Sequence, residues 1–221
     1  MPKYAARRAR GVESHETRGV FSMNGDQRPP SQPSDNGGGP PSEQVKLQHI
    51  TARVPENVSR GAFSTGMIVM TGGTEFILDF IQNIGHPPHV AARIILPHAT
   101  MPQFIQALRT NLEMYIQRFG QPPELPKPQA GGKQPSAQEI YDELKMPDSL
   151  LSGAYANGVM IGHTAAEFKL DFLTNLFPHS AVSSRVFLSA PQVPRVLDSL
   201  INTFQQFQQR LKQPPQPPES A

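Results

Sequence analysis

The sequence predicts an α+β protein made of two tandem β-β-β-β-α units, each an antiparallel meander with a C-terminal helix. Three observations lead to this prediction. The chain contains a long internal repeat, each copy contains stretches that alternate between apolar and polar residues, and each copy ends in a helical pattern. Because consecutive strands joined by short turns usually pair with each other, a meander is the expected topology.

The repeat is read directly from the sequence. Residues 54–119 and 146–211 align without a gap at an offset of 92, and about a quarter of the aligned positions are identical. A period of this length indicates a duplicated domain, since solenoid repeats span about 20–50 residues. A domain this small buries little core by itself. We therefore expect the two copies to pack together as a pseudo-dimer.

Three strands are predicted in each copy from hydrophobic patterning. In the first copy the apolar stretch 61–71 reads as a strand that ends in a tight Gly-Gly turn. Residues 75–81 alternate in a way typical of a half-exposed strand, and 90–96 forms the next strand. Phe63 and its counterpart Tyr155 are expected to face the core.

A fourth strand is predicted upstream of each copy, at Val45–Val54 and at Ile140–Met146. A helix is predicted from about Pro102 to Phe119, where Gly120 gives a C-terminal stop. Apolar residues at helical spacing form its buried stripe. The stripe comprises Phe104, Ile105, Leu108, Leu112, Tyr115, Ile116 and Phe119 in the first copy, and Val196, Leu197, Leu200, Phe204, Phe207 and Leu211 in the second.

The 24 proline and 17 glycine residues concentrate outside the repeats. Such segments have too little apolar surface to offset the entropy of ordering. The predicted organisation is a disordered leader (1–43), a first repeat (44–120), a Pro-rich linker (121–136), a second repeat (137–212) and a disordered Pro-rich tail (213–221).

Composition restricts the function. The formal net charge of +2 gives little support for nucleic-acid binding by the folded part. The absence of cysteine excludes disulfides and thiolate chemistry and is compatible with a reducing compartment, so we expect a cytoplasmic protein. There is no run of 18 apolar residues that could cross a membrane. A basic arm within residues 1–22 could bind acidic partners, including nucleic acid, unless translation starts at Met23.

Two charged pairs recur at the repeat offset. If the two hairpins pair symmetrically, Asp79 lies opposite Arg93, and Asp171 lies opposite Arg185. The simplest interpretation is a pair that fixes strand register, since opposite charges across strands contribute roughly 0.2–1 kcal/mol. The alternative is a recognition site on the exposed sheet face.

Glu75 and Glu167 share a sheet face with those aspartates. On each strand the Glu and the Asp are four residues apart, roughly 13 Å, which is too far for the carboxylate pairs of glycosidases. We therefore interpret them as solvated residues of an interaction face. The histidines have no metal-ligand spacing, and no nucleophile elbow or phosphate loop is present. We expect no cofactor, no metal and no enzymatic activity.

The repeated residues resemble DUF3467, a prokaryotic family of domains of unknown function. The second copy carries the resemblance through Ala154–Asn157, Glu167–Phe172, Ser184–Leu188 and Pro191–Leu211, and the first through Glu75–Phe80 and Arg93–Leu96. The first copy departs at Thr65, where the second has Asn157, a candidate interaction residue. The resemblance implies that single-copy members dimerise and that this chain is a covalent version of that dimer. It implies no activity.

The leading functional prediction is a non-enzymatic interaction or assembly module whose partner is another protein or a further copy of itself. A polypeptide-binding chaperone similar to SecB is the alternative, by fold analogy. The Met-rich stretch Met67–Met70 supports this alternative because methionine adapts to varied partners. A nucleic-acid-binding protein is a further alternative, and an enzyme is the weakest.

Overall fold

Two four-stranded sheets and two long helices make up the fold, which the computed structural model describes for residues 52–126, 137–176 and 178–212. The first repeat contains α1 (Glu56–Ser59), β1 (Ala62–Ser64), β2 (Gly66–Thr71), β3 (Glu75–Gln82), β4 (His89–Pro97), η1 (His98–Thr100) and α2 (Met101–Phe119). The second contains α3 (Ala137–Glu143), η2 (Asp148–Leu150), β5 (Ala154–Tyr155), β6 (Gly158–His163), β7 (Glu167–Leu176), β8 (His179–Ser189), η3 (Ala190–Gln192) and α4 (Val193–Lys212). The predicted α+β class, with two units of four strands and a C-terminal helix, is confirmed.

The two repeats exchange their first strands. Sheet A has the order β1-β8-β7-β6 and sheet B the order β2-β3-β4-β5. Each sheet is therefore an antiparallel meander from one repeat plus a short strand from the other. The exchanged strands pair in parallel, with Phe63 opposite Phe187 in sheet A and Tyr155 opposite Ile95 in sheet B. The predicted meander thus holds for the three long strands of each unit. The strand of each unit that crosses to the partner repeat, β1 or β5, is not the strand that the sequence predicted upstream of that copy.

The exchange extends beyond these strands into two arms, residues 53–64 and residues 145–156. At the start of the first arm, Arg53 pairs with Ala181, and its N–H donates to the Ser180 carbonyl at 2.9 Å. At the start of the second arm, Lys145 pairs with His89 in the equivalent way. Each arm therefore follows the outer strand of the other repeat's sheet and supplies it with main-chain partners.

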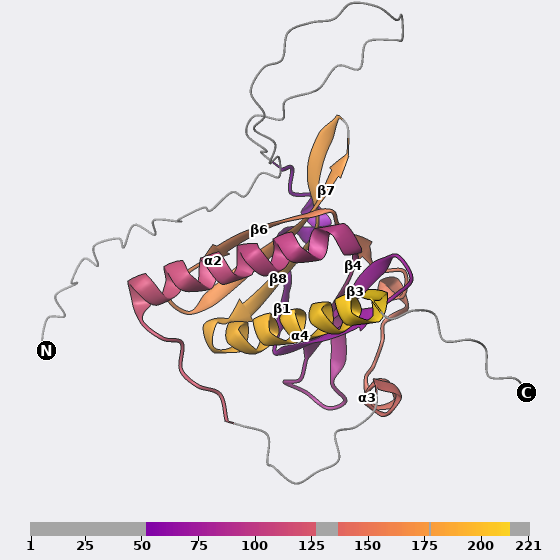
Figure 1. The fold of residues 1–221 in the computed structure, drawn as a ribbon, viewed down its shortest axis with the longest axis horizontal. Helices are drawn as coiled ribbons and strands as arrows, with labels where there is room; N and C mark the ends of the chain where they lie inside the picture. Colours follow the sequence, from indigo (N-terminus) through magenta and orange to yellow (C-terminus); the bar gives the residue numbers. More distant parts are fainter. Residues whose placement is uncertain (1–51, 127–136, 177, 213–221) are drawn as a thin grey trace, which may run out of the picture.

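The helices also cross between repeats. They lie side by side along one side of the sheets (Figure 1), with α2 over β6 and α4 over β2. The ring centroids of Tyr115 on α2 and Phe168 on β7 are 5.3 Å apart, and those of Phe207 on α4 and Phe76 on β3 are 5.2 Å apart. Because these contacts are equivalent under the repeat offset, the two halves are related by a pseudo-twofold axis.

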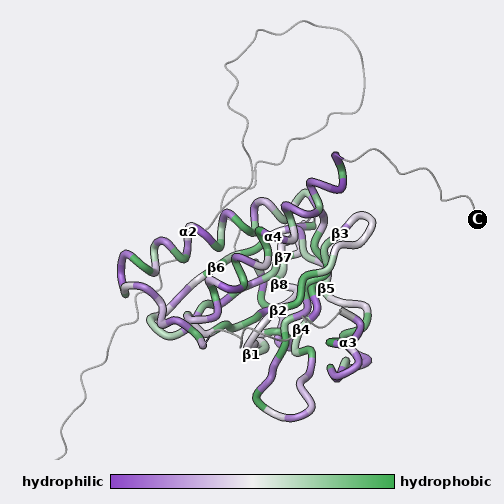
Figure 2. The backbone as a smooth tube through the Cα atoms, turned by 60° about the horizontal axis from the view of Figure 1, so that its bottom comes forward, coloured by the Kyte–Doolittle hydropathy of each residue, from purple (hydrophilic) through white to green (hydrophobic). Residues whose placement is uncertain are grey.

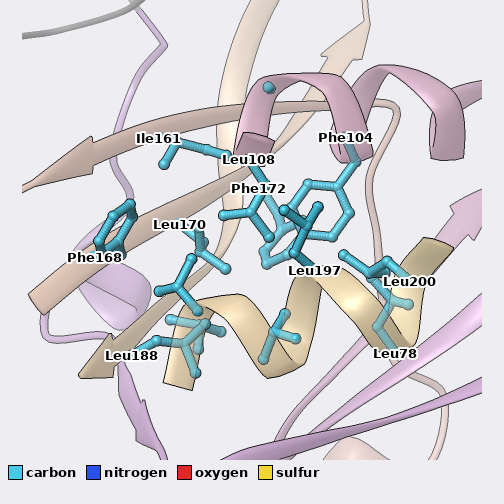
Figure 3. Packing of buried hydrophobic residues seen from close by; sticks show 14 of the residues in the cluster. Leu78, Phe104, Leu108, Ile161, Phe168, Leu170, Phe172, Leu188, Leu197 and Leu200 are labelled. Atoms are coloured by element: carbon cyan, nitrogen blue, oxygen red, sulfur yellow. The ribbon is translucent and has the colours of Figure 1, made fainter. Parts of the chain in front are cut away.

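One hydrophobic core results from this arrangement. The inward residues of both sheets pack with the buried stripes of both helices, as Figure 3 shows for Phe104, Leu108, Leu197 and Leu200. The rings of Phe80 and Phe172 meet at a centroid distance of 5.6 Å. Since each half supplies about half of one continuous core, burial of apolar surface joins the two repeats.

Three predictions about the bounds and burial of strands and helices are corrected by the structure. The stretch 61–71 is two strands, because Thr65 lies where the chain passes from sheet A to sheet B. Residues 140–146 were expected to be a strand but lie mostly in α3, whose Ala, Gln and Glu residues favour a helix. Phe119 and Leu211, expected in the buried stripes, are 39% and 70% exposed at the helix ends.

Several predicted segments lie outside the described residues. They are the leader, the basic arm, the tail, most of the linker and the greater part of the proposed strand 45–54. The described start of the linker contacts α4, where Arg195 Nη2 donates to the Leu125 carbonyl at 2.9 Å. Among the described residues, no helix is both long and apolar enough to cross a membrane.

Candidate functional site

The two predicted charged pairs are observed as bidentate ion pairs. Asp79 lies directly opposite Arg93, whose Nε and Nη2 donate to the two carboxylate oxygens at 2.7 Å each. In the other sheet, Arg185 donates to Asp171 at 2.6 and 2.9 Å. Both aspartates are buried, with Asp79 completely inaccessible. The hydrogen bond to Asp79 raises the pKa of Arg93, so the guanidinium is a permanent cation.

The ion pairs also hold the arms in place. Arg93 Nη1 donates to the Leu151 carbonyl of the second arm at 3.3 Å, and Arg185 Nη1 donates to the Ser59 carbonyl of the first arm at 3.1 Å. Each guanidinium therefore connects its own sheet to the other repeat. The sequence predicted an exposed sheet face here, but the arm covers this part of the face. The aspartates are accordingly not available to a partner protein.

The first repeat has an additional contact at this position. The hydroxyl of Tyr141 on α3 donates to Asp79 Oδ2. Burial, and then this hydrogen bond, raise the pKa of the Tyr141 phenol, so the tyrosine stays a donor at any physiological pH. Sequence reasoning did not include Tyr141 in the site because α3 was expected to be a strand. Its counterpart at the repeat offset, His49, lies outside the described residues.

Glu75 and Glu167 are not part of these ion pairs. They stand at the start of β3 and β7, at the hairpins that join each to the preceding strand. Glu75 accepts hydrogen bonds from the hydroxyl and N–H of Thr74, at 2.5 and 3.1 Å, and these bonds lower the pKa of its carboxyl. Glu167 is exposed. The Glu75 carboxylate therefore acts locally, at the hairpin turn between β2 and β3.

Asn157 has a structural role that Thr65 reproduces. Asn157 Oδ1 accepts the Asn175 N–H at 2.7 Å, and its Nδ2 donates to the Asn175 carbonyl at 3.2 Å. In the first repeat, Thr65 Oγ1 accepts the Asn83 N–H at 2.9 Å. Both side chains fix the crossing point between the sheets to the end of the neighbouring strand. The departure of the first copy at Thr65 therefore conserves the contact.

A row of apolar side chains crosses the outer face of sheet B, the face turned away from α2 and α4. Strand register places Met70 beside Ile77, Ile77 beside Ile95, and Ile95 beside Tyr155. We call these four residues the apolar row. The first three are partly exposed, and Tyr155 is 45% exposed. The row contains no charge, and Figure 2 shows the strands that carry it as largely hydrophobic.

The equivalent row of sheet A has a different composition. It consists of Gly162, Lys169, Phe187 and Phe63. A lysine therefore stands where sheet B has Ile77, and a glycine where it has Met70. The apolar row is consequently a feature of one face of the pseudo-dimer only.

The exposed aromatics in these rows correct a sequence prediction. Phe63 and Tyr155 were expected to face the core, but they are 38% and 45% exposed. Their neighbours Ser64 and Ala156 take the inward positions and are completely buried. Because a small or polar residue points inward while the aromatic points outward, hydropathy gave no signal of this orientation. Ile84 and Leu176, which are equivalent residues at the tips of the two hairpins, are also exposed.

No group of three or more His, Asp or Glu side chains that could hold a metal ion occurs within the described ranges.

A family model described as a protein of unknown function (DUF3467) matches the chain twice, over residues 29–122 and 123–213. No curated protein matches the chain, and no solved structure matches it.

Proposed function

This chain belongs to the DUF3467 family, in two tandem copies, and we propose that it is a non-enzymatic protein-interaction module. The observation that carries the proposal is the apolar row on sheet B. It spans all four strands of the sheet, including the strand donated by the other repeat. An exposed apolar surface without charge is typical of a protein-binding site.

The shape of the row indicates what kind of partner it fits. It runs across the strands from the edge strand β2 to the exchanged strand β5. The buried Asp79–Arg93 pair lies on one side of it, and Glu75 lies on the other. We therefore expect the partner to contribute an apolar segment with few charges. The exposed Tyr155 is an amphipathic side chain of the kind that often anchors such contacts.

The sequence of the second repeat supplies a conservative way to disrupt this surface. Position 77 corresponds to Lys169 in sheet A, where a lysine is accommodated between the same types of strand. The substitution Ile77→Lys should therefore preserve the fold. A lysine in the centre of an apolar interface would weaken binding at least about tenfold.

Site-specific photo-crosslinking in the native cell tests the proposal. A photoreactive phenylalanine analogue replaces Tyr155 in the full chain, and a matched control replaces Phe119, an exposed aromatic on α2. We expect one or a few discrete adducts from position 155 that Ile77→Lys removes and that are absent from position 119. Adducts that persist in Ile77→Lys, or that arise equally from both positions, would contradict the proposal.

A polypeptide-binding chaperone would use the same row, and a second measurement separates the two functions. A chaperone would suppress the aggregation of a denatured client and give adducts with many proteins, whereas an interaction module would do neither.

We place the function in the cytoplasm, a setting with which a chain without cysteine is compatible.

A further inference from the structure

A cavity of about 380 Å³ lies between the two arms. Its fifteen lining residues come from the two arms, within 57–62 and 149–154, and from β4 and β8, at 91–93 and 183–185. Its volume falls within the range of small-molecule sites. None of the residues of the apolar row lines it, so the cavity is separate from the proposed docking surface.

The cavity follows the pseudo-twofold symmetry of the molecule. Fourteen of its fifteen lining residues form seven pairs at the repeat offset, such as Arg93 with Arg185 and Gly61 with Gly153. The remaining residue is Arg60, whose counterpart Ser152 is not in the lining. Both repeats therefore build the same half-site, and the symmetry is broken by one additional cation.

Two β-bulges turn towards the cavity. In sheet B, Phe80 pairs with Ala92 and Ile81 with Val90, which leaves Ala91 as the extra residue. In sheet A, Phe172 pairs with Ser184 and Leu173 with Val182, which leaves Ser183 as the extra residue. Both extra residues line the cavity. Bulges are frequent next to functional sites, where they redirect a side chain, and here the same bulge occurs in both repeats.

The chemistry of the lining is suited to an anion. The lining residues include three arginines, three serines and one asparagine, and they include no Asp or Glu. The guanidinium groups of Arg93 and Arg185 are held by Asp79 and Asp171, which compensate their charge, and their Nη1 atoms donate to the Leu151 and Ser59 carbonyls. The exposed Arg60 is therefore the lining cation that remains to attract an anion. A guanidinium group matches the geometry of carboxylate and phosphate oxygens.

The close approach of the arms also defines this site. Gly61 and Gly153 have φ values of +66° and +68°, which favour glycine. A Cβ atom at Gly61 would lie 2.8 Å from Arg185 Cγ, and one at Gly153 would lie 2.9 Å from Arg93 Cγ. The two glycines thus bring the main chain of each arm against the arginine of the other repeat.

We propose that the cavity between the arms binds a small anionic molecule that carries a phosphate or carboxylate group, with Arg60 as the asymmetric anchor. Because both repeats line the site, the ligand would contact both halves at once. A ligand bound only to the assembled pseudo-dimer would stabilise it against unfolding.

Titration of the full chain with inorganic phosphate, and separately with citrate, tests the proposal at constant ionic strength. The amide resonances of Gly61 and Gly153 are followed by ¹H–¹⁵N correlation spectroscopy, with Gly120 at the end of α2 as the remote reference. We expect saturable shifts of Gly61 and Gly153 and none of Gly120. Saturation by phosphate alone would assign a phosphate-bearing ligand, and saturation by citrate alone a carboxylate-bearing one.

Two variants and a matched control complete the experiment. Arg60→Gln should weaken anion binding about tenfold, since it removes one charge-assisted contact. Ser149→Trp, at an exposed position of the lining, should block the cavity. Arg109→Gln, which changes an exposed arginine on α2, should bind as the unmodified chain does. Linear, non-saturating shifts with both anions, or equal binding by Arg60→Gln and Arg109→Gln, would overturn the proposal.

Discussion

The buried ion pair of sheet B provides the sharpest prediction about stability. The Asp79 carboxylate is completely inaccessible and accepts hydrogen bonds from Arg93 and Tyr141. Replacing Arg93 by Met preserves much of the side-chain volume but leaves the carboxylate with only the tyrosine as a donor. Removing one partner of a buried ion pair costs about 3–5 kcal/mol. For a folded region of this size, that loss lowers the Tm by about 6–20 °C.

Urea unfolding of a double-mutant cycle measures this effect. The cycle comprises Arg93→Met, Asp79→Leu and the double variant. Because the double variant leaves no buried charge, its loss should be smaller than the sum of the single losses by about 2 kcal/mol or more. Additive single losses, or an Arg93→Met variant within about 1 kcal/mol of the unmodified chain, would refute the reasoning. The same cycle at Asp171 and Arg185 is the internal control.

Three further predictions concern an arm, the sheet crossing at Asn157, and His163 on β6. Gly153→Ala should lower the Tm, because it forces an alanine into a left-handed conformation and against Arg93 and Ile95, whereas Gly66→Ala, with open space around it, should not. Asn157→Ala should cost about 1 kcal/mol in urea unfolding, and Asn157→Thr should restore much of that loss. Burial, and then the charge of Arg118, lower the pKa of His163, so the unfolded chain binds more protons and stability should fall as the pH decreases below about 6.5. Thermal melts between pH 5 and 8 should show this fall, and His163→Gln should reduce it.

The sequence predicts the long strands and the helices well because their patterns are local. The alternation through Phe76, Leu78 and Phe80 identifies the inward face correctly, and all three are completely buried. The symmetric hairpin likewise predicts that Asp79 and Arg93 face each other. Each of these inferences needs only the chain within one repeat.

The exchange between repeats could not be predicted in the same way. β1 and β5 have similar sequences, and nothing local indicates which repeat each joins. The burial of Asp79 was missed for the same reason, because the covering arm comes from the other repeat. The apolar row was also hidden, since Tyr155 meets Ile95 only through the exchanged strand.

Arms, helices and core join the two repeats into one folding unit. This unity is tested by introducing a protease site into the linker between residues 127 and 136 of the full chain and cleaving the folded protein. Size-exclusion chromatography and native mass spectrometry should then show the two halves together as one species at low micromolar concentration, and they should separate only in denaturant. Two halves that part in buffer and persist as folded monomers would contradict the claim.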